Sequence, residues 1–193
     1  ILRKTSIFSA LEVAAYNINR KRHKLKLFEF GKTYHTKDNN RFEEKYLSIL
    51  LSGSTHEPSW TTATTPTSFF QLKSIVETVL SKLGIRDGVS QPDESGLFSE
   101  GLCLAKGPMT LVSFGLVKKE VLKSFDIKQD ILFANFNWDI ILKLLLKKAI
   151  VFTEISKYPE VKRDFALLLD ESITFKQVYD LAYKNERKLL RDV

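Results

Sequence analysis

The sequence has little of the residues that mark secreted, fibrous or membrane-spanning proteins. It contains one cysteine, Cys103, which excludes an intrachain disulfide and fits a reducing compartment, so we expect a cytoplasmic protein. The best apolar run, Ile140–Leu146, is interrupted by Lys143 and is too short for a membrane span. No signal peptide is visible, but Ile1 is not a natural start, so we expect that an upstream segment is missing.

The 193 residues have an ordinary globular composition, with 44% hydrophobic and 27% charged residues, which argues against a disordered chain. The length suffices for one large domain, or for one domain and part of a second. The net charge of +7 is unevenly spread, because residues 1–53 carry eleven Lys/Arg against five Asp/Glu, whereas residues 154–193 carry eight of each. The excess centres on Asn19–Lys26. This run could attract phosphate, but we favour a solvated helix C-terminus whose cations complement the helix dipole.

Apolar spacing divides the chain into helices and strands. A helical period predicts helices over 6–20, 68–83, 118–125, 139–147 and 174–190. Apolar and aromatic runs bounded by turn residues predict strands over 25–35, 45–53, 96–105, 110–116, 131–138 and 164–169. Thr174 with Gln177 forms a capping-box pattern. The chain is therefore α+β, with antiparallel strands and flanking helices in a domain over 1–150 and the truncated start of a second domain over 151–193.

No stretch has the spacing of a known catalytic or metal site. The run Gly31–Thr33 would need a glycine five positions earlier to form a phosphate loop, but Lys26 stands there. The three histidines lie too far from one another and from Cys103 for a zinc site, and we expect Cys103 to be structural. Asp126 and Asp130 could together hold Mg²⁺, but a loop between a helix and a strand is the simpler interpretation.

Several stretches of the chain occur in the order found in one known family. They are Leu2–Ser6, Leu27–Tyr34, Phe69–Glu77, Phe125 with Asp126 and Phe133, and Ser156–Ala166. Together they resemble the C-terminal part of the β subunit of bacterial phenylalanyl-tRNA synthetases, over essentially the whole chain. The last stretch, SKYPEVKRD followed by an apolar run, is the most specific of them.

The resemblance implies a fold and an activity. Residues 1–150 would form a class II aminoacyl-tRNA synthetase-like domain, an antiparallel sheet with flanking helices. Residues 151–193 would begin a ferredoxin-like anticodon-binding domain. The whole ligase attaches phenylalanine to its tRNA using ATP and magnesium in the α subunit, while the β copy of the domain is inactive. We therefore expect no cofactor in this part of the ligase, and the family's editing domain would lie upstream.

Two motifs allow that inactivity to be examined. Class II motif 2 places an arginine, which clamps the α-phosphate of ATP, and then an acid after a Gly-x-x-Phe/Tyr strand, but here neither follows Gly31–Tyr34. Motif 3 is a Gly-rich strand that enters a helix beginning with arginine, and its counterpart here has neither residue type. We expect Trp138 to fill space where a nucleotide would lie. The degenerate positions are His35, Lys37, Ala134, Asn135 and Trp138. We predict no ATP binding of the class II kind, no catalytic residue and no metal ligand.

The resemblance also implies two partners. One is the α subunit, in an (αβ)₂ heterotetramer, for which the apolar faces of the helices over 6–20 and 68–83 are candidate surfaces, although core packing explains them equally well. The other is the anticodon region of phenylalanine tRNA, which the second domain would meet. Candidate phosphate contacts are Lys157, Lys162, Lys176, Lys184 and Arg187. We expect no membrane contact.

Two other interpretations stay open from the sequence alone. A free-standing RNA-binding or protein-interaction module would gather basic side chains on one face and need no α partner. A class II-type enzyme with unfamiliar ligands would bind ATP by itself. In either case we expect Arg163 and Asp164, at the mouth of the strand predicted over 164–169, to fix the entry of that strand or the domain junction rather than to carry out chemistry.

Overall fold

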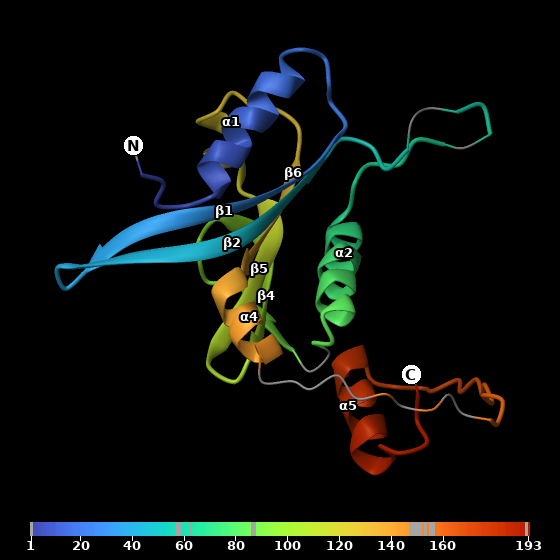
Figure 1. Ribbon diagram of the computed structural model, residues 1–193. Helices are drawn as coiled ribbons and strands as arrows, with labels where there is room; N and C mark the ends of the chain where they lie inside the picture. Colours follow the sequence, from blue (N-terminus) through green and yellow to red (C-terminus); the bar gives the residue numbers. More distant parts are fainter. Residues whose placement is uncertain are drawn as a thin grey trace. The chain divides into compact units, whose positions relative to one another are not determined.

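A computed structural model of the chain describes residues 2–193 except 57–58, 62, 86–87, 147–151, 153, 155–156 and 192. The chain divides into two compact units, Ile1–Ile150 and Val151–Val193, and each is described by itself (Figure 1). The predicted helix end at Lys147 and much of the predicted boundary segment between the domains lie outside the described residues. Within the described residues, the helices are all too short or too polar to cross a membrane.

The first unit is built on one antiparallel sheet of six strands in the order β1-β2-β6-β5-β4-β3. The strands are Leu25–Lys37 (β1), Asn40–Ser52 (β2), Val89–Pro92 (β3), Phe98–Lys106 (β4), Met109–Val117 (β5) and Ile131–Asn137 (β6). Five of them lie where the apolar pattern predicts strands. The sequence did not predict β3, because four residues that end in a proline at the sheet edge give no readable alternation.

Helices cover the two faces of this sheet. Helices α2 (Phe69–Lys82) and α4 (Trp138–Leu146) cover one face, and their core includes Leu72, Val76, Phe114, Phe136 and Ile141. Helices α1 (Ile7–Ile18) and α3 (Lys119–Lys123) cover the other, and their core includes Ile7, Leu11, Leu50, Leu122 and Phe133. We call these the α2–α4 face and the α1–α3 face. The predicted apolar faces of α1 and α2 are thus buried inside the unit, which leaves them unavailable to a partner subunit.

The hairpin of β1 and β2 extends well past the rest of the sheet (Figure 1). Its pairing runs from Leu25 opposite Ser52 to Lys37 opposite Asn40, whereas β6 pairs with β2 only from Tyr46 onward. Asp38 and Asn39 form the turn with φ of 48° and 60°, the left-handed conformation of a two-residue type I′ hairpin. The predicted strands stopped short of this turn, because residues 40–45 are exposed and show no apolar alternation.

The second unit contains helix α5 (Phe175–Asn185), which begins at the predicted capping box. The Thr174 backbone N–H donates to Gln177 Oε1 at 2.7 Å. The helix ends five residues before its predicted end, where the Glu186 carboxylate accepts from the backbone N–H groups of Lys188 and Leu189 at 2.7 and 3.0 Å. These hydrogen bonds turn the chain out of the helix.

The strand predicted over 164–169 is wrong. Those residues have no strand conformation and are all exposed. A β-strand is stabilised by hydrogen bonds to a neighbouring strand, and no described part of residues 151–193 forms one. The apolar alternation was present, but the pairing partner that it requires was not.

The largest side chain at the centre of the α2–α4 core offers a test of this architecture. Phe114 is 0% exposed and its ring stacks on Phe69 with centroids 5.5 Å apart. Phe114→Ala should therefore lower the free energy of unfolding by about 3–5 kcal/mol, measured by urea denaturation. The control Phe70→Ala removes a ring that is 77% exposed and should change it by less than about 1 kcal/mol. Equal losses in the two variants would contradict this placement of the core.

Candidate functional site

A row of polar side chains crosses the α1–α3 face of the sheet. Residues paired directly across antiparallel strands share a face, so the register places one polar residue of each strand in this row. Its members, in sheet order, are Glu29, Ser48, Asn135, Ser113, Cys103 and Gln91. Because these residues come from six different strands, no contiguous sequence motif contains them. We call this set the polar row and take it as the candidate site.

The sheet register separates the predicted motif positions. His35 follows Glu29 along β1 at an even interval, so it lies on the α1–α3 face beyond the polar row, on the projecting hairpin, whereas the side chain of Lys37 is outside the described part of the chain. Asn135 is itself a member of the row. Ala134 points the other way and is 0% exposed in the α2–α4 core. The structure thus brings His35 and Asn135, two of the five positions, to one face.

Trp138 does not lie where the sequence suggested. Its ring packs edge-on against Phe30 with centroids 5.0 Å apart, and it belongs to the α2–α4 core. Phe30 alternates with Glu29 along β1 and so lies on the face opposite the polar row. Trp138 therefore cannot fill space above His35 and Asn135, and the expectation that it excludes a nucleotide there is corrected.

The N-terminal segment closes one end of the polar row. Arg3 donates from Nη1 to Glu29 Oε1 at 2.7 Å and to the Tyr46 hydroxyl at 3.2 Å, and its carbonyl accepts from the Tyr34 N–H at 2.8 Å. The Ser6 hydroxyl donates to Asn135 Oδ1 at 3.0 Å. At this end of the polar row, the side chains of Glu29 and Asn135 are therefore occupied by hydrogen bonds to the N-terminal segment. Sequence reasoning missed them because no spacing pattern links Arg3, Glu29 and Tyr46.

The electrostatics of this contact keep Arg3 charged and Tyr46 neutral. The hydrogen bond that Arg3 donates to Glu29, and then the charge of Glu29, raise the pKa of the Arg3 guanidinium. Burial, followed by the charge of Glu29, raises the pKa of the Tyr46 phenol, whose residue is 3% exposed. Arg3 and Glu29 are themselves partly exposed, so their ion pair contributes at most about 1 kcal/mol. Its role is to hold the segment in place.

The one arginine of the β1–β2 hairpin, Arg41, pairs with Thr36 and therefore lies on the face of the sheet opposite His35. Strands β1 and β6 and helix α4 contain no arginine. His35 stacks on Phe42 with centroids 5.2 Å apart, and its Nε2 lies 3.9 Å from Glu44 Oε1. Lys32 lies 2.7 Å from Glu43, and that hydrogen bond raises the pKa of the Lys32 amine. The planar, bidentate grip that a triphosphate needs is therefore missing from the motif 2 and motif 3 positions.

The other end of the polar row opens into a hollow of about 510 Å³. Its lining includes Gln91, Cys103 and Ser113 from the row together with Asp93 and Glu94. Two carboxylates and no cation line this hollow, so its charge disfavours a phosphate. Burial, and then the charge of Asp93, raise the pKa of the Cys103 thiol, which keeps it in its unreactive neutral form. This supports the structural role expected for Cys103.

The remaining predicted site residues do not assemble with the polar row. Gly31–Thr33 lie within β1 rather than in a phosphate-binding loop, and Asp126 lies in the turn after α3 with φ of 54°. Among the described residues, no group of three or more His, Cys, Asp and Glu could hold a metal ion.

The five candidate tRNA contacts lie in the second unit, and all are exposed. They are Lys157, Lys162, Lys176, Lys184 and Arg187, of which Lys176 and Lys184 lie on α5. Arg163 is also exposed and donates from Nη1 to the Lys162 carbonyl at 3.1 Å. Since no strand begins at Asp164, the expectation that Arg163 and Asp164 fix the entry of a strand is wrong.

Comparison with known proteins places this geometry in a family. Residues 1–138 match the family described as the phenylalanyl tRNA synthetase beta chain CLM domain. The whole chain aligns with phenylalanine–tRNA ligase beta subunits from Bacteroides fragilis, at 36% identity, and from Porphyromonas gingivalis, at 34%. It spans about a quarter of the length of these curated relatives, since it covers 25% of each.

A solved structure shows the same fold at low sequence identity. A pyrrolysyl-tRNA synthetase from Desulfitobacterium hafniense superposes with a TM-score of 0.57 at 15% identity, over 74% of this chain and 49% of that one. This chain therefore shares a fold, over 74% of its length, with part of that tRNA synthetase.

Cys103 provides a test of the hollow, because it is the only cysteine in the chain. Its raised pKa predicts that iodoacetamide modifies the folded protein more slowly than the urea-unfolded protein at the same pH, as followed by mass spectrometry. The folded-state rate should keep rising with pH beyond the range where a free thiol is already ionised. A folded rate equal to the unfolded rate at each pH would contradict the burial of the thiol.

Proposed function

Because the chain belongs to the phenylalanyl-tRNA synthetase beta chain family, we propose that it forms part of the β subunit of a phenylalanine–tRNA ligase. That enzyme attaches phenylalanine to its tRNA using ATP and magnesium. The single observation that carries the proposal is the match of the entire chain to β subunits at up to 36% identity. A match of this extent also argues against a free-standing module.

Within that ligase, this part of the β subunit is non-catalytic. Three features support the proposal: the missing arginines at the motif positions, the use of Glu29 and Asn135 by the N-terminal segment, and the acidic hollow at the other end of the polar row. Each removes a way of binding a triphosphate. The chemistry then belongs to a companion α subunit, with which the β subunit assembles as an (αβ)₂ heterotetramer.

The surface proposed for the α subunit lies on the edge strand β1. The apolar sides of α1 and α2 are buried in this unit, so a partner must use other side chains. Phe28 and Phe30 are 74% and 57% exposed and lie next to each other on one side of β1, with ring centroids 6.5 Å apart. Adjacent exposed aromatic rings of this kind are typical of protein interfaces.

The second unit is the proposed start of a ferredoxin-like anticodon-binding domain. The exposed cations Lys157, Lys162, Lys176, Lys184 and Arg187 are its proposed contacts to tRNA phosphates.

Titration with ATP and magnesium tests the loss of chemistry. We expect no saturable heat of binding by isothermal titration calorimetry at millimolar ATP, because β1, β6 and α4, which hold the motif positions, have no guanidinium to clamp the phosphates. A class II synthetase with intact motifs is the positive control. Saturable binding by this chain would contradict the proposal and revive the interpretation as an enzyme with unfamiliar ligands.

Co-expression with the cognate α subunit tests the assembly. The tagged chain should retain the α subunit on an affinity column, and Phe28→Ser should weaken retention at least about tenfold, as expected for an interface aromatic. The control Phe70→Ser removes an equally exposed ring from α2 and should leave retention unchanged. If the α subunit is absent from the wild-type eluate, the proposed partner is contradicted. If both variants lose retention equally, the proposed surface is contradicted.

A further inference from the structure

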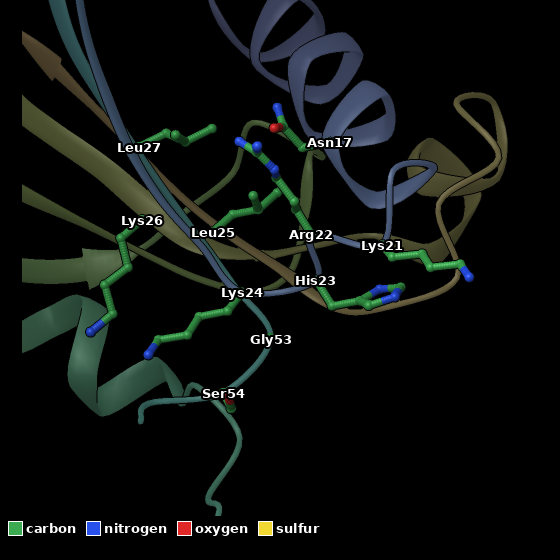
Figure 2. A pocket seen from close by; sticks show the side chains of 10 residues that line it. All are labelled: Asn17, Lys21, Arg22, His23, Lys24, Leu25, Lys26, Leu27, Gly53 and Ser54. Atoms are coloured by element: carbon green, nitrogen blue, oxygen red, sulfur yellow. The ribbon is translucent and has the colours of Figure 1, made fainter. Parts of the chain in front are cut away.

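The turn between α1 and β1 concentrates positive charge beside a hollow. This turn, Lys21–Lys26, lines a concavity of about 770 Å³ together with Asn17, Gly53 and Ser54. In Figure 2, Lys24 and Lys26 extend to the same side of the strand, whereas Arg22 extends toward Asn17. We call this segment the basic turn. Its cations therefore lie on both sides of one hollow.

The basic turn is anchored to the sheet rather than loosely solvated. The Gln129 amide donates from Nε2 to the His23 carbonyl at 2.8 Å and to the Ser52 hydroxyl at 2.6 Å. Ser52, which is 0% exposed, donates in turn to the Asp130 carbonyl at 2.6 Å. The backbone of the turn also passes so close to Gly53 that a Cβ there would lie 2.3 Å from the His23 carbonyl oxygen. These contacts hold the cations in position before any ligand arrives.

The end of helix α1 accounts for only part of this basic run. The helix stops at Ile18, and its last turn contains no basic residue. Arg20 serves the helix end, since its Nη1 donates to the Tyr16 carbonyl at 3.1 Å and its guanidinium lies 3.4 Å over the Tyr16 ring. Lys21, Arg22 and Lys26 form no ion pair with any acid in the described part of the chain. The interpretation of the run as a helix C-terminus is therefore confirmed through Arg22, because the Lys21 and Arg22 N–H groups donate to the Ile18 and Asn17 carbonyls at 2.8 and 3.1 Å, and it is corrected only for Lys24 and Lys26.

We propose that the basic turn binds the phosphate backbone of an RNA strand through Arg22, Lys24 and Lys26. The choice of RNA rests on the proposed function, while the site itself rests on the geometry of the turn. Lys24 and Lys26 extend to one side of the hollow and Arg22 extends toward Asn17, so the three cations are spread along the turn and can contact separate phosphates of one strand rather than enclose a single one. The site lies in the first unit and is separate from the cations proposed in the second.

The test measures the binding of a fluorescein-labelled phenylalanine tRNA transcript to the full chain by fluorescence anisotropy, between about 50 and about 200 mM salt. The triple variant R22Q/K24Q/K26Q should raise Kd about tenfold and lower the slope of log K against log salt by about two, because three phosphate contacts are lost. The charge-preserving variant R22K/K24R/K26R should bind like the wild type.

A matched control separates the site from net charge. The variant K82Q/K119Q/K143Q removes three exposed lysines from α2, α3 and α4 and should leave Kd and slope unchanged. Thermal melts should show that all variants fold. Three outcomes would each overturn the proposal. The control variant could weaken binding as much as the triple variant does, or the triple variant could bind tRNA with wild-type affinity. The third is that the wild type binds anionic lipid vesicles but not tRNA.

The outcome is distinguishable from failure of the proposed function. A chain that retains the α subunit but binds tRNA equally well with and without the basic turn refutes this inference alone. If tRNA binding is lost only when the five cations of the second unit are replaced by glutamine, this inference alone is likewise refuted. A chain that binds tRNA through the basic turn but never retains the α subunit refutes the proposed assembly alone.

Discussion

The register of β6 is the constraint on which the rest of the first unit depends. This strand lies between β2 and β5, and its side chains alternate between the two cores: Phe136 packs under α2 and α4, while Phe133 packs under α1 and α3. A slip by one residue would send every side chain to the opposite face. Asn135 would then enter the α2–α4 core without its partner Ser6. Apolar packing and one polar contact therefore select the same register.

The sequence pattern predicted a helix or strand correctly where all the residues that determine it lie within that element or beside its ends. Helix α2 shows this, because its apolar spacing, the Ser68 cap that accepts from the Gln71 N–H, and Gly84 with φ of 72° all lie within seventeen residues. The tip of the β1–β2 hairpin escaped prediction because its strands are exposed on both sides, although Asp38 and Asn39 already carried the turn signal. The strand over 164–169 failed for the opposite reason, since its pattern was present without a pairing partner.

Only those features of the candidate site that depend on which residue types are present could be predicted from the sequence. A missing arginine is visible in the sequence, and β1, β6 and α4, which hold the motif positions, contain none of the guanidinium groups that a phosphate clamp uses. The position of Trp138 depends instead on the strand register, which placed its ring against Phe30 on the far face. The polar row joins six strands across the sheet, so it exists only after folding. Nothing in the spacing of its members along the chain could have indicated it.

A domain can lose the geometry of catalysis and keep the means of binding the same kind of ligand. A triphosphate clamp requires planar donors in fixed orientation, so the loss of one guanidinium abolishes it. Attraction of a polynucleotide backbone depends mainly on the number and accessibility of cations, and it tolerates small displacements. The basic turn meets this weaker requirement, because Gln129 and Gly53 hold its backbone against the sheet while Arg22 and Lys26 stay exposed. The residues of a triphosphate clamp and the cations of a backbone-binding surface can therefore change independently within one fold, because the sheet that positions them is stabilised by neither.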